Sequence, residues 1–493
     1  MPSPLKVLLV ASECVPFAKT GGLGDVVGAL ARALARLGVD ARVVMPLYAG
    51  LPWREFEVLE GILLVPTWFG EARAGVRLGR LPRSEVPVYF LEYHQYFNRP
   101  HLYGPPGGGY ADNLERFTFL SRGALELCTA LGWMPDVVHA NDWQTALAPV
   151  YLNTVEWGRP LHGSASVYTI HNLSYQGVFS GEELVVTGLG AEHYHPGEFE
   201  HFGTMNLTKA ALYHSTALST VSPTYAREIQ TSAYGFGLDG VLRSRGTDLF
   251  GILNGIDTEE WNPATDPHLA ARFDARDLSG KDACKAALQR EAGLPVRPEV
   301  AVFGVIGRAV PQKGFDVLAQ ALDRILDWDL QIVLLASGDP AIEASFTRVA
   351  RERSDRVAAW LCFDDARAHR IEAGADFFLM PSRFEPCGLS QMYSLRYGTL
   401  PIVRATGGLI DTVENYDEAT GGGTGFVLND LSADSLADTV GWALATWYDR
   451  PHHIATLRRR AMQRDFSWSR AAREYERVYR LACTRRRGQE LGI

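Results

Sequence analysis

A short apolar stretch, a turn containing glycines and an amphipathic helix follow one another in both halves of this chain. In the first half, the apolar residues 7–11 lead to a Lys-Thr-Gly-Gly turn at residues 19–22 and a helical pattern that ends at Gly38. In the second half, the apolar residues 300–306 lead through the turn 307–314 into another such helix. A buried strand that enters a helix through glycines is typical of nucleotide-binding α/β domains. The sequence therefore predicts two domains of one architecture.

Further apolar stretches alternate with helical patterns in both halves, which is typical of a mainly parallel sheet covered by helices on both faces. Residues 257–299 interrupt this pattern with Pro, Asp and Arg. We therefore expect an α/β fold of two doubly wound, Rossmann-like domains, over residues 1–256 and 257–465, facing each other across a cleft. Residues 466–493 are predicted to form a C-terminal helix and tail, with the helix packing back on the body.

The charge balance and the cysteines argue against several classes of function. The chain has 48 basic and 57 acidic side chains, a net charge of -9, so it lacks the positive field that would attract nucleic acid or an anionic membrane. Its six cysteines include no CxxC pair, which argues against a disulfide framework or a structural zinc site and fits the cytoplasm. The apolar residues 7–11 are too few for a signal peptide or a membrane span.

Three cations, Lys19, Arg308 and Lys313, lie in the two glycine turns. Such turns lie at the carboxyl ends of the strands, where backbone N–H groups and helix starts bind anions. Three cations there suit a diphosphate whose negative charge grows as it leaves. No carboxylate cluster with magnesium spacing accompanies them, so we expect a site without metal or cofactor. The alternative is that Lys19 and Lys313 are solvated loop residues.

Glu385 follows a predicted strand at residues 377–380 and precedes a helix, which places it at the mouth of the expected cleft. Pro386 favours an extended backbone at Glu385. A carboxylate there can hydrogen-bond sugar hydroxyls and stabilise positive charge at an anomeric carbon. From spacing alone, a loop glutamate near a helix start is an equally good interpretation. Cys387 is interpreted as a packing or contact residue, because no base can be assigned to it.

Polar residues also end two predicted strands in the first half, Asp142 after residues 137–139 and His171 with Asn172 after residues 167–170. For each strand end a structural role is as good an interpretation as a functional one, because Asp142 could cap a helix and His171 could satisfy a buried carbonyl. The histidine pairs at residues 193 and 195 and at residues 452 and 453 lack metal-type geometry and are interpreted as structural.

These motifs, taken in order, resemble those of bacterial glycogen synthases and plant starch synthases, the family 5 glycosyltransferases with the GT-B fold. The signature KTGGLGDV occupies residues 19–26, QKG occupies residues 312–314, and PSRFEPCGL occupies residues 381–389. The other matching segments lie at residues 135–143, 169–177, 220–226, 254–257, 397–409 and 466–468.

The resemblance implies a retaining glucosyltransferase that elongates an α-1,4-glucan such as glycogen from the donor ADP-glucose and releases ADP. It implies catalytic roles for four residues: Glu385, His171, Arg308 and Lys313. It further implies donor contacts from Lys19, Gly22, Asp25, Asn254, Cys387, Gly388, Gly407 and Gly408, and sugar-side or acceptor contacts from Asp142, Asn172 and Tyr103.

Two alternatives stay open, together with the oligomeric state. The same fold could use UDP-glucose or a small sugar acceptor, because a nucleobase is read mostly by loop shape. A non-catalytic glucan-binding protein would predict the loss of Glu385, Lys313 or Arg308, yet all three are present. Tyr393 stands where many other retaining GT-B enzymes have a second glutamate, and the family that the chain resembles lacks that acid as well.

Overall fold

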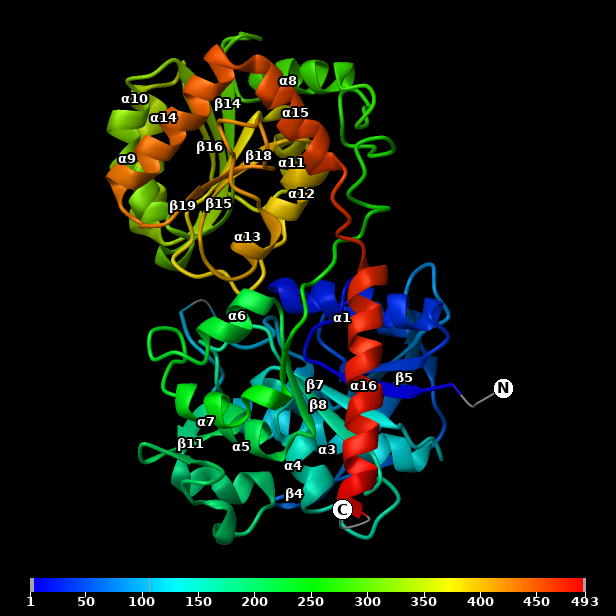
Figure 1. Ribbon diagram of the computed structural model, residues 1–493. Helices are drawn as coiled ribbons and strands as arrows, with labels where there is room; N and C mark the ends of the chain where they lie inside the picture. Colours follow the sequence, from blue (N-terminus) through cyan, green and yellow to red (C-terminus); the bar gives the residue numbers. More distant parts are fainter. Residues whose placement is uncertain (1–3, 106, 491–493) are drawn as a thin grey trace. The chain divides into compact units, whose positions relative to one another are not determined.

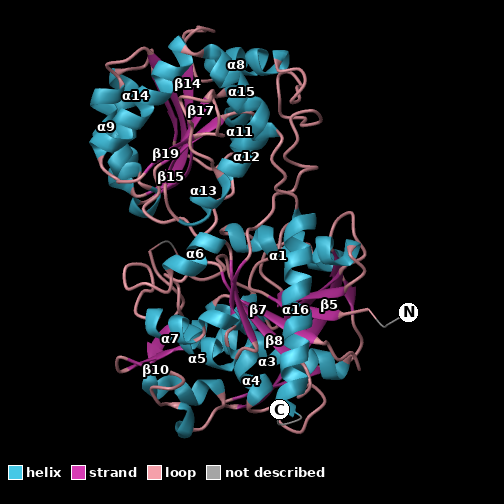
Figure 2. Ribbon diagram, in the orientation of Figure 1, coloured by secondary structure: helices cyan, strands magenta, loops and turns pink. Residues whose placement is uncertain are grey.

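The structure, a computed structural model, describes residues 4–105 and 107–490 and divides into two compact units (Figure 1). Unit 1 contains the chain up to Ile252 and again from Trp468 onward, and unit 2 is Leu253–Ser467. The domain boundaries predicted from the sequence lie after residues 256 and 465. Each unit has a central sheet with helices on both of its faces (Figure 2). The α/β fold with two parallel-sheet domains is thereby confirmed.

Unit 1 is built on a sheet with the strand order β13-β12-β8-β7-β1-β2-β6-β5-β3. Neighbours from β13 to β6 are parallel, whereas β5 pairs antiparallel with β3, β4 and β6. The strands are β1 (Lys6–Val10), β2 (Asp40–Pro46), β3 (Glu57–Val58), β4 (Leu63–Thr67), β5 (Gly70–Arg80), β6 (Pro87–Glu92), β7 (Val137–Asn141), β8 (Ala165–Ile170), β12 (Ala217–Thr220) and β13 (Leu249–Gly251). The order changes direction between β1 and β7, the position at which doubly wound sheets bind ligands.

The helices of unit 1 bury one face against this sheet. In α1, the buried residues Val26, Leu30 and Leu34 recur at helical spacing, as the sequence predicted. The helices before the second unit are α1 (Gly22–Arg36), α2 (His94–Phe97), α3 (Asn113–Ala130), α4 (Leu147–Asn153), α5 (Leu207–His214), α6 (Pro223–Glu228) and α7 (Asp239–Ser244). A small antiparallel sheet of β9 (Val178–Ser180), β10 (Glu200–His201) and β11 (Thr204–Asn206) completes the unit.

The C-terminal helix α16 (Trp468–Glu490) returns to unit 1, where it packs along α1 and β8 (Figure 1). The buried Tyr475 and Tyr479 lie on its inner face. Tyr479 Oη lies 2.8 Å from Nδ1 of His139, a residue of the central strand β7. The expected C-terminal helix that packs on the body is confirmed, and its partner is the first domain.

Unit 2 has a fully parallel sheet with the strand order β16-β15-β14-β17-β18-β19. Its strands are β14 (Ala301–Ala309), β15 (Leu330–Gly338), β16 (Val357–Trp360), β17 (Phe377–Met380), β18 (Leu400–Arg404) and β19 (Phe426–Leu428). Strands buried on both faces are apolar throughout, as in β17 with Phe377, Phe378, Leu379 and Met380.

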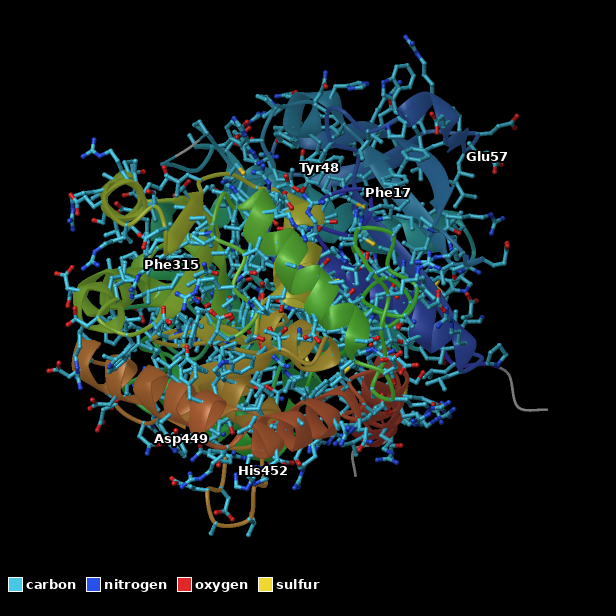
Figure 3. All side chains as sticks on the ribbon, turned by 90° about the horizontal axis from the view of Figure 1, so that it is seen from above. Phe17, Tyr48, Glu57, Phe315, Asp449 and His452 are labelled. Carbon is cyan, nitrogen blue, oxygen red and sulfur yellow. The ribbon has the colours of Figure 1, made fainter. Side chains whose placement is uncertain are left out.

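The helices of unit 2 are α8 (Ser279–Glu291), α9 (Phe315–Ile325), α10 (Pro340–Glu352), α11 (Asp365–Gly374), α12 (Ser390–Arg396), α13 (Gly407–Thr412), α14 (Ala433–Asp449) and α15 (Pro451–Met462). Figure 3 marks the start of α9 with Phe315 and the turn between α14 and α15 with Asp449 and His452. Among the helices within residues 4–105 and 107–490, none is both long enough and apolar enough to cross a membrane.

Candidate functional site

Three adjacent strands of unit 2, β14, β17 and β18, carry the predicted donor-site residues at their carboxyl ends. Lys313 follows β14, and its Nζ lies 2.5 Å from Oε2 of Glu385, which follows β17. The hydroxyl of Ser382 donates to the same carboxylate oxygen over 3.1 Å. Glu385 is buried and Lys313 is partly exposed. The structure therefore brings together the two charged groups that the sequence placed in separate turns.

The glycine pair that begins α13 lets the Glu385 loop approach the backbone of that helix. A Cβ at Gly407, where φ is +46°, would lie 2.0 Å from the backbone oxygen of Glu385. A Cβ at Gly408 would lie 2.1 Å from the backbone oxygen of Cys387. The Gly408 N–H donates to the Glu385 carbonyl over 3.1 Å. Both positions therefore require glycine, because any side chain would push the loop that carries Glu385 out of place.

Cys387 and Asn254 lie side by side in the interior of unit 2. Burial raises the pKa of the Cys387 thiol to about 12, against weaker opposing hydrogen bonds from Asn254. A thiol of this pKa stays protonated, which supports the interpretation of Cys387 as a contact residue and not a nucleophile. Asn254 is buried, and its Oδ1 has no partner among the described residues. An unsatisfied buried oxygen points to a donor group from a ligand.

Two further predicted residues of unit 2, Gly388 and Arg308, differ in their hydrogen-bond partners. Gly388 precedes α12, and the side chain of Gln391 donates to its carbonyl over 2.9 Å. Arg308, at the end of β14, is exposed, and its guanidinium has no hydrogen-bond or ion-pair partner within the described part of the chain. An exposed guanidinium five residues before Lys313 in the chain is available to bind an anion.

In unit 1, a buried glutamate that the sequence analysis did not single out holds the glycine turn in place. The Glu13 carboxylate follows β1 and accepts hydrogen bonds from the Thr20 backbone N–H and hydroxyl, both over 2.6 Å. It also accepts from the Gly21 N–H over 3.3 Å and from the Tyr103 hydroxyl over 2.5 Å. The available signal was an acidic residue three positions after an apolar strand, because a carboxylate buried there needs several hydrogen-bond donors.

The predicted residues Lys19, Gly22 and Asp25 lie on that turn and on the first turn of α1. Lys19 Nζ forms a 2.8 Å ion pair with the Asp25 carboxylate, and the lysine side chain is about half exposed. A Cβ at Gly22 would meet nothing within 4 Å, so local packing alone does not require this glycine. The exposed cation remains accessible to an anion.

The adjacent strands β7 and β8 bring Asp142 and His171 together. Asp142 follows β7 and accepts the His171 N–H over 2.7 Å, instead of capping the short helical turn that follows it. Burial raises the pKa of Asp142 to about 7, although the N–H groups of His171 and Asn172 oppose that shift. His171 Nε2 lies 2.9 Å from Oδ1 of Asn141. Burial lowers the pKa of His171 to about 3, so its ring is neutral at neutral pH.

The remaining predicted residues of unit 1 have local partners. The Asn172 side chain accepts from the Ser174 N–H over 3.0 Å. The Tyr103 hydroxyl lies 2.8 Å from that of Ser12 in addition to its bond with Glu13. Of the histidines interpreted as structural, His193 pairs with Glu198 and His453 with Tyr416, which fits that interpretation.

Comparison with known families gives two matches that together span most of the chain. The family described as "Starch synthase catalytic domain" matches residues 6–244. The family described as "Glycosyl transferases group 1" matches residues 289–460. Each match lies within one of the two units described above.

Several curated proteins are similar over nearly their whole length. "Glycogen synthase 1" of Geobacter sulfurreducens is 52% identical over 98% of this chain and 97% of that protein. "Glycogen synthase" of Anaeromyxobacter sp. is 50% identical over 97% of this chain and 99% of its own. Among solved structures, the catalytic domain of starch synthase IV from Arabidopsis thaliana, bound to ADP and acarbose, has a TM-score of 0.90 at 35% identity, covering 98% of this chain and 100% of that chain. Sucrose-phosphate synthase from Thermosynechococcus elongatus shares the fold, with a TM-score of 0.61 at 17% identity over 97% of this chain and 98% of that chain.

Proposed function

The chain belongs to the glycogen synthase and starch synthase family of glycosyltransferases, and on that premise we propose that it elongates an α-1,4-glucan from ADP-glucose and releases ADP. The observation that carries the proposal is full-length similarity to glycogen synthases, combined with a unit 2 site in which Lys313 and Glu385 meet. The partners of the protein are then the ADP-glucose donor and the glucan acceptor.

In this proposal, unit 2 holds the donor. Arg308 and Lys313 bind the diphosphate, because guanidinium and ammonium groups form charge-assisted hydrogen bonds to phosphate oxygens. Glu385 faces the glucosyl unit, where a buried carboxylate stabilises the positive charge that develops at the anomeric carbon. The unpartnered Oδ1 of Asn254 and the loop of Cys387 and Gly388 contribute the remaining contacts to the donor.

The unit 1 residues are proposed to contact the donor and the acceptor sugars. Lys19, with Gly22 and Asp25, adds a cation to the donor site. His171 is neutral because of its lowered pKa, so it exchanges hydrogen bonds with sugar hydroxyls and does not act as a cation. Asp142, Asn172 and Tyr103 are proposed for the sugar and acceptor side.

The proposed reaction proceeds with retention by attack on the same face that the diphosphate leaves. The bond between the anomeric carbon and the phosphate oxygen breaks, and the acceptor 4-hydroxyl oxygen bonds to that carbon. The departing phosphate oxygen accepts the hydroxyl proton. Arg308 and Lys313 stabilise the charge that grows on the diphosphate, which matters most in the transition state.

We also propose a cytoplasmic location. All six cysteines are free thiols, the state that a reducing compartment maintains.

The deciding experiment measures nucleoside diphosphate release from ADP-glucose and from UDP-glucose, each with and without glycogen. Release from ADP-glucose that depends on glycogen supports the proposal. A preference for UDP-glucose, or release that does not depend on glycogen, would favour the alternative donor or a small acceptor. Glycogen binding without release from either donor would favour a non-catalytic glucan-binding protein.

A further inference from the structure

A group of potential metal ligands lies in unit 2 where the segment after Leu253 meets helix α11. Glu260 belongs to that segment, and Asp365 and His369 belong to α11. One ligand atom from each of these three residues lies within 4.8 Å of the others. Asp365 and His369 are four positions apart, which places them on the same face of the helix.

The imidazole of His369 is held in one orientation by buried neighbours. Its Nδ1 lies 2.6 Å from Oδ2 of Asp266, and both side chains are almost fully buried. The Tyr397 hydroxyl donates to the same Asp266 oxygen over 2.6 Å. The ring also stacks on Trp261, with a centroid distance of 3.8 Å and an interplanar angle of 10°. The ring therefore cannot turn without breaking these contacts.

This arrangement leaves Nε2 as the ligand atom of His369. Nε2 has no hydrogen-bond partner within the described residues, although His369 is only 2% exposed. A histidine whose Nδ1–H is donated to a carboxylate presents Nε2 as a basic, oriented ligand, which is how metal-binding histidines are usually supported.

The charge around the group favours a cation. Glu260 and Asp365 are both exposed carboxylates. Two arginines of α11, Arg367 and Arg370, form ion pairs with Glu291 over 3.3 Å and 2.7 Å. Two exposed carboxylates whose oxygens lie within 4.8 Å of each other make the position between them electrostatically favourable for a divalent cation.

We propose that Glu260, Asp365 and His369 bind one divalent first-row transition ion of the Zn²⁺ type, with water completing its coordination. One nitrogen and two carboxylate oxygens form a ligand set that Zn²⁺ accepts at about 2.0–2.2 Å. Atoms bound to one such ion lie at most about 4.4 Å apart, so small rotations of the exposed carboxylates complete the site.

Such an ion would join the segment around Trp261 to α11. The Trp261 ring stacks on Tyr393 of α12 on its other side, with a centroid distance of 3.8 Å. The ion would thus fix a layer of aromatic rings that connects α11 to α12. The sequence predicts no metal here, because metal motifs are recognised by short ligand spacings, and Glu260 lies far from Asp365 along the chain.

The test is calorimetric titration of ZnCl₂ into the purified, chelator-treated full-length protein, alongside Glu260→Gln and Asp365→Asn. We expect one Zn²⁺ per chain, and affinity at least tenfold weaker in each variant. Glu259→Gln is the matched control, because it removes a neighbouring acid of the same segment and should leave the affinity unchanged. Both variants carry exposed substitutions, and their circular dichroism spectra should match that of the parent.

A second readout separates this site from binding by thiols. Zn²⁺ should raise the unfolding temperature of the parent and of Glu259→Gln, and this shift should be lost in Glu260→Gln and Asp365→Asn. The proposal is overturned if no Zn²⁺ binds, if binding survives both substitutions, or if Glu259→Gln weakens it equally. The glucosyltransferase activity is measured separately, so its outcome does not affect this result.

Discussion

The hydrogen bonds that Glu13 accepts hold the glycine turn of unit 1, so we predict a loss of activity that grows with the number of bonds removed. Glu13→Ala removes an acceptor for four donors, three of them at 2.6 Å or less. At about 1 kcal/mol for each of the three short bonds, the ordered turn becomes about 3 kcal/mol less stable relative to its disordered forms. Since about 1.4 kcal/mol corresponds to a factor of ten, the fraction of molecules with the turn correctly placed falls by about a hundredfold.

Glu13→Gln should have a much smaller effect. One carboxylate oxygen accepts from the Thr20 and Tyr103 hydroxyls, and a glutamine amide placed there can donate to both, because hydroxyls also accept. The other oxygen keeps its backbone N–H donors. Only the charge is lost, so kcat/KM should fall by about tenfold or less. Tyr103→Phe removes one hydrogen-bond donor and should lower kcat/KM only a few-fold.

The assay is kcat/KM for ADP-glucose at saturating glycogen, with thermal unfolding of each variant as the control for folding. The expected order is a loss of about a hundredfold for Glu13→Ala, less than tenfold for Glu13→Gln and a few-fold for Tyr103→Phe. If Glu13→Ala retains the parental kcat/KM, or if Glu13→Gln is as damaging as Glu13→Ala, Glu13 does not position the turn in the way the structure indicates.

Three further predictions concern single substitutions. Glu385→Ala should lower kcat by at least about a hundredfold without weakening the binding of ADP, because the carboxylate acts on charge that appears in the transition state; a parallel loss of ADP affinity would contradict this role. Lys313→Ala should weaken ADP binding at least about tenfold in calorimetry, and an unchanged Kd would rule out diphosphate contact. Burial lowers the pKa of His139 to about 3, below its unfolded value near 6.5, so its contribution to stability is complete above pH 6.5 and is lost as the pH falls toward 3. In denaturant unfolding between pH 6 and pH 4, the pH dependence should be shallower in His139→Gln by up to about 1.4 kcal/mol per pH unit, and identical slopes would refute this.

The parts of the site that follow from topology could be predicted from the sequence. Parallel strands that each end in a glycine turn place their following residues along one sheet edge, so Lys313, Glu385 and the Gly407–Gly408 pair were expected near one another. The adjacent strands β14, β17 and β18 confirm that placement. Apolar segments that alternate with helices indicate parallel strands, and so one common edge for these turns, whereas the order of β14, β17 and β18 along that edge comes from the structure.

The parts that depend on side-chain partners could not be predicted in this way. Glu13 was missed because its role arises from donors at Thr20, Gly21 and Tyr103, which only the folded turn brings to one carboxylate. Tyr393, which was noted only for the acid that it replaces, stacks on Trp261 over 3.8 Å. Both contacts join residues whose spacing follows no helical or strand period, so no sequence pattern indicates them.

The ion pair between Lys313 and Glu385 connects donor binding to the charge that the glucosyl group develops. Without donor, the buried Glu385 carboxylate is stabilised, among the described residues, by Lys313 and by the side-chain hydroxyl of Ser382. A diphosphate that attracts Lys313 leaves this desolvated carboxylate with the weaker partner, which raises its free energy in the donor complex. The positive charge that grows at the anomeric carbon then replaces the lysine as counter-charge. The carboxylate therefore interacts more strongly with the transition state than with the bound donor, which is the condition for lowering the barrier.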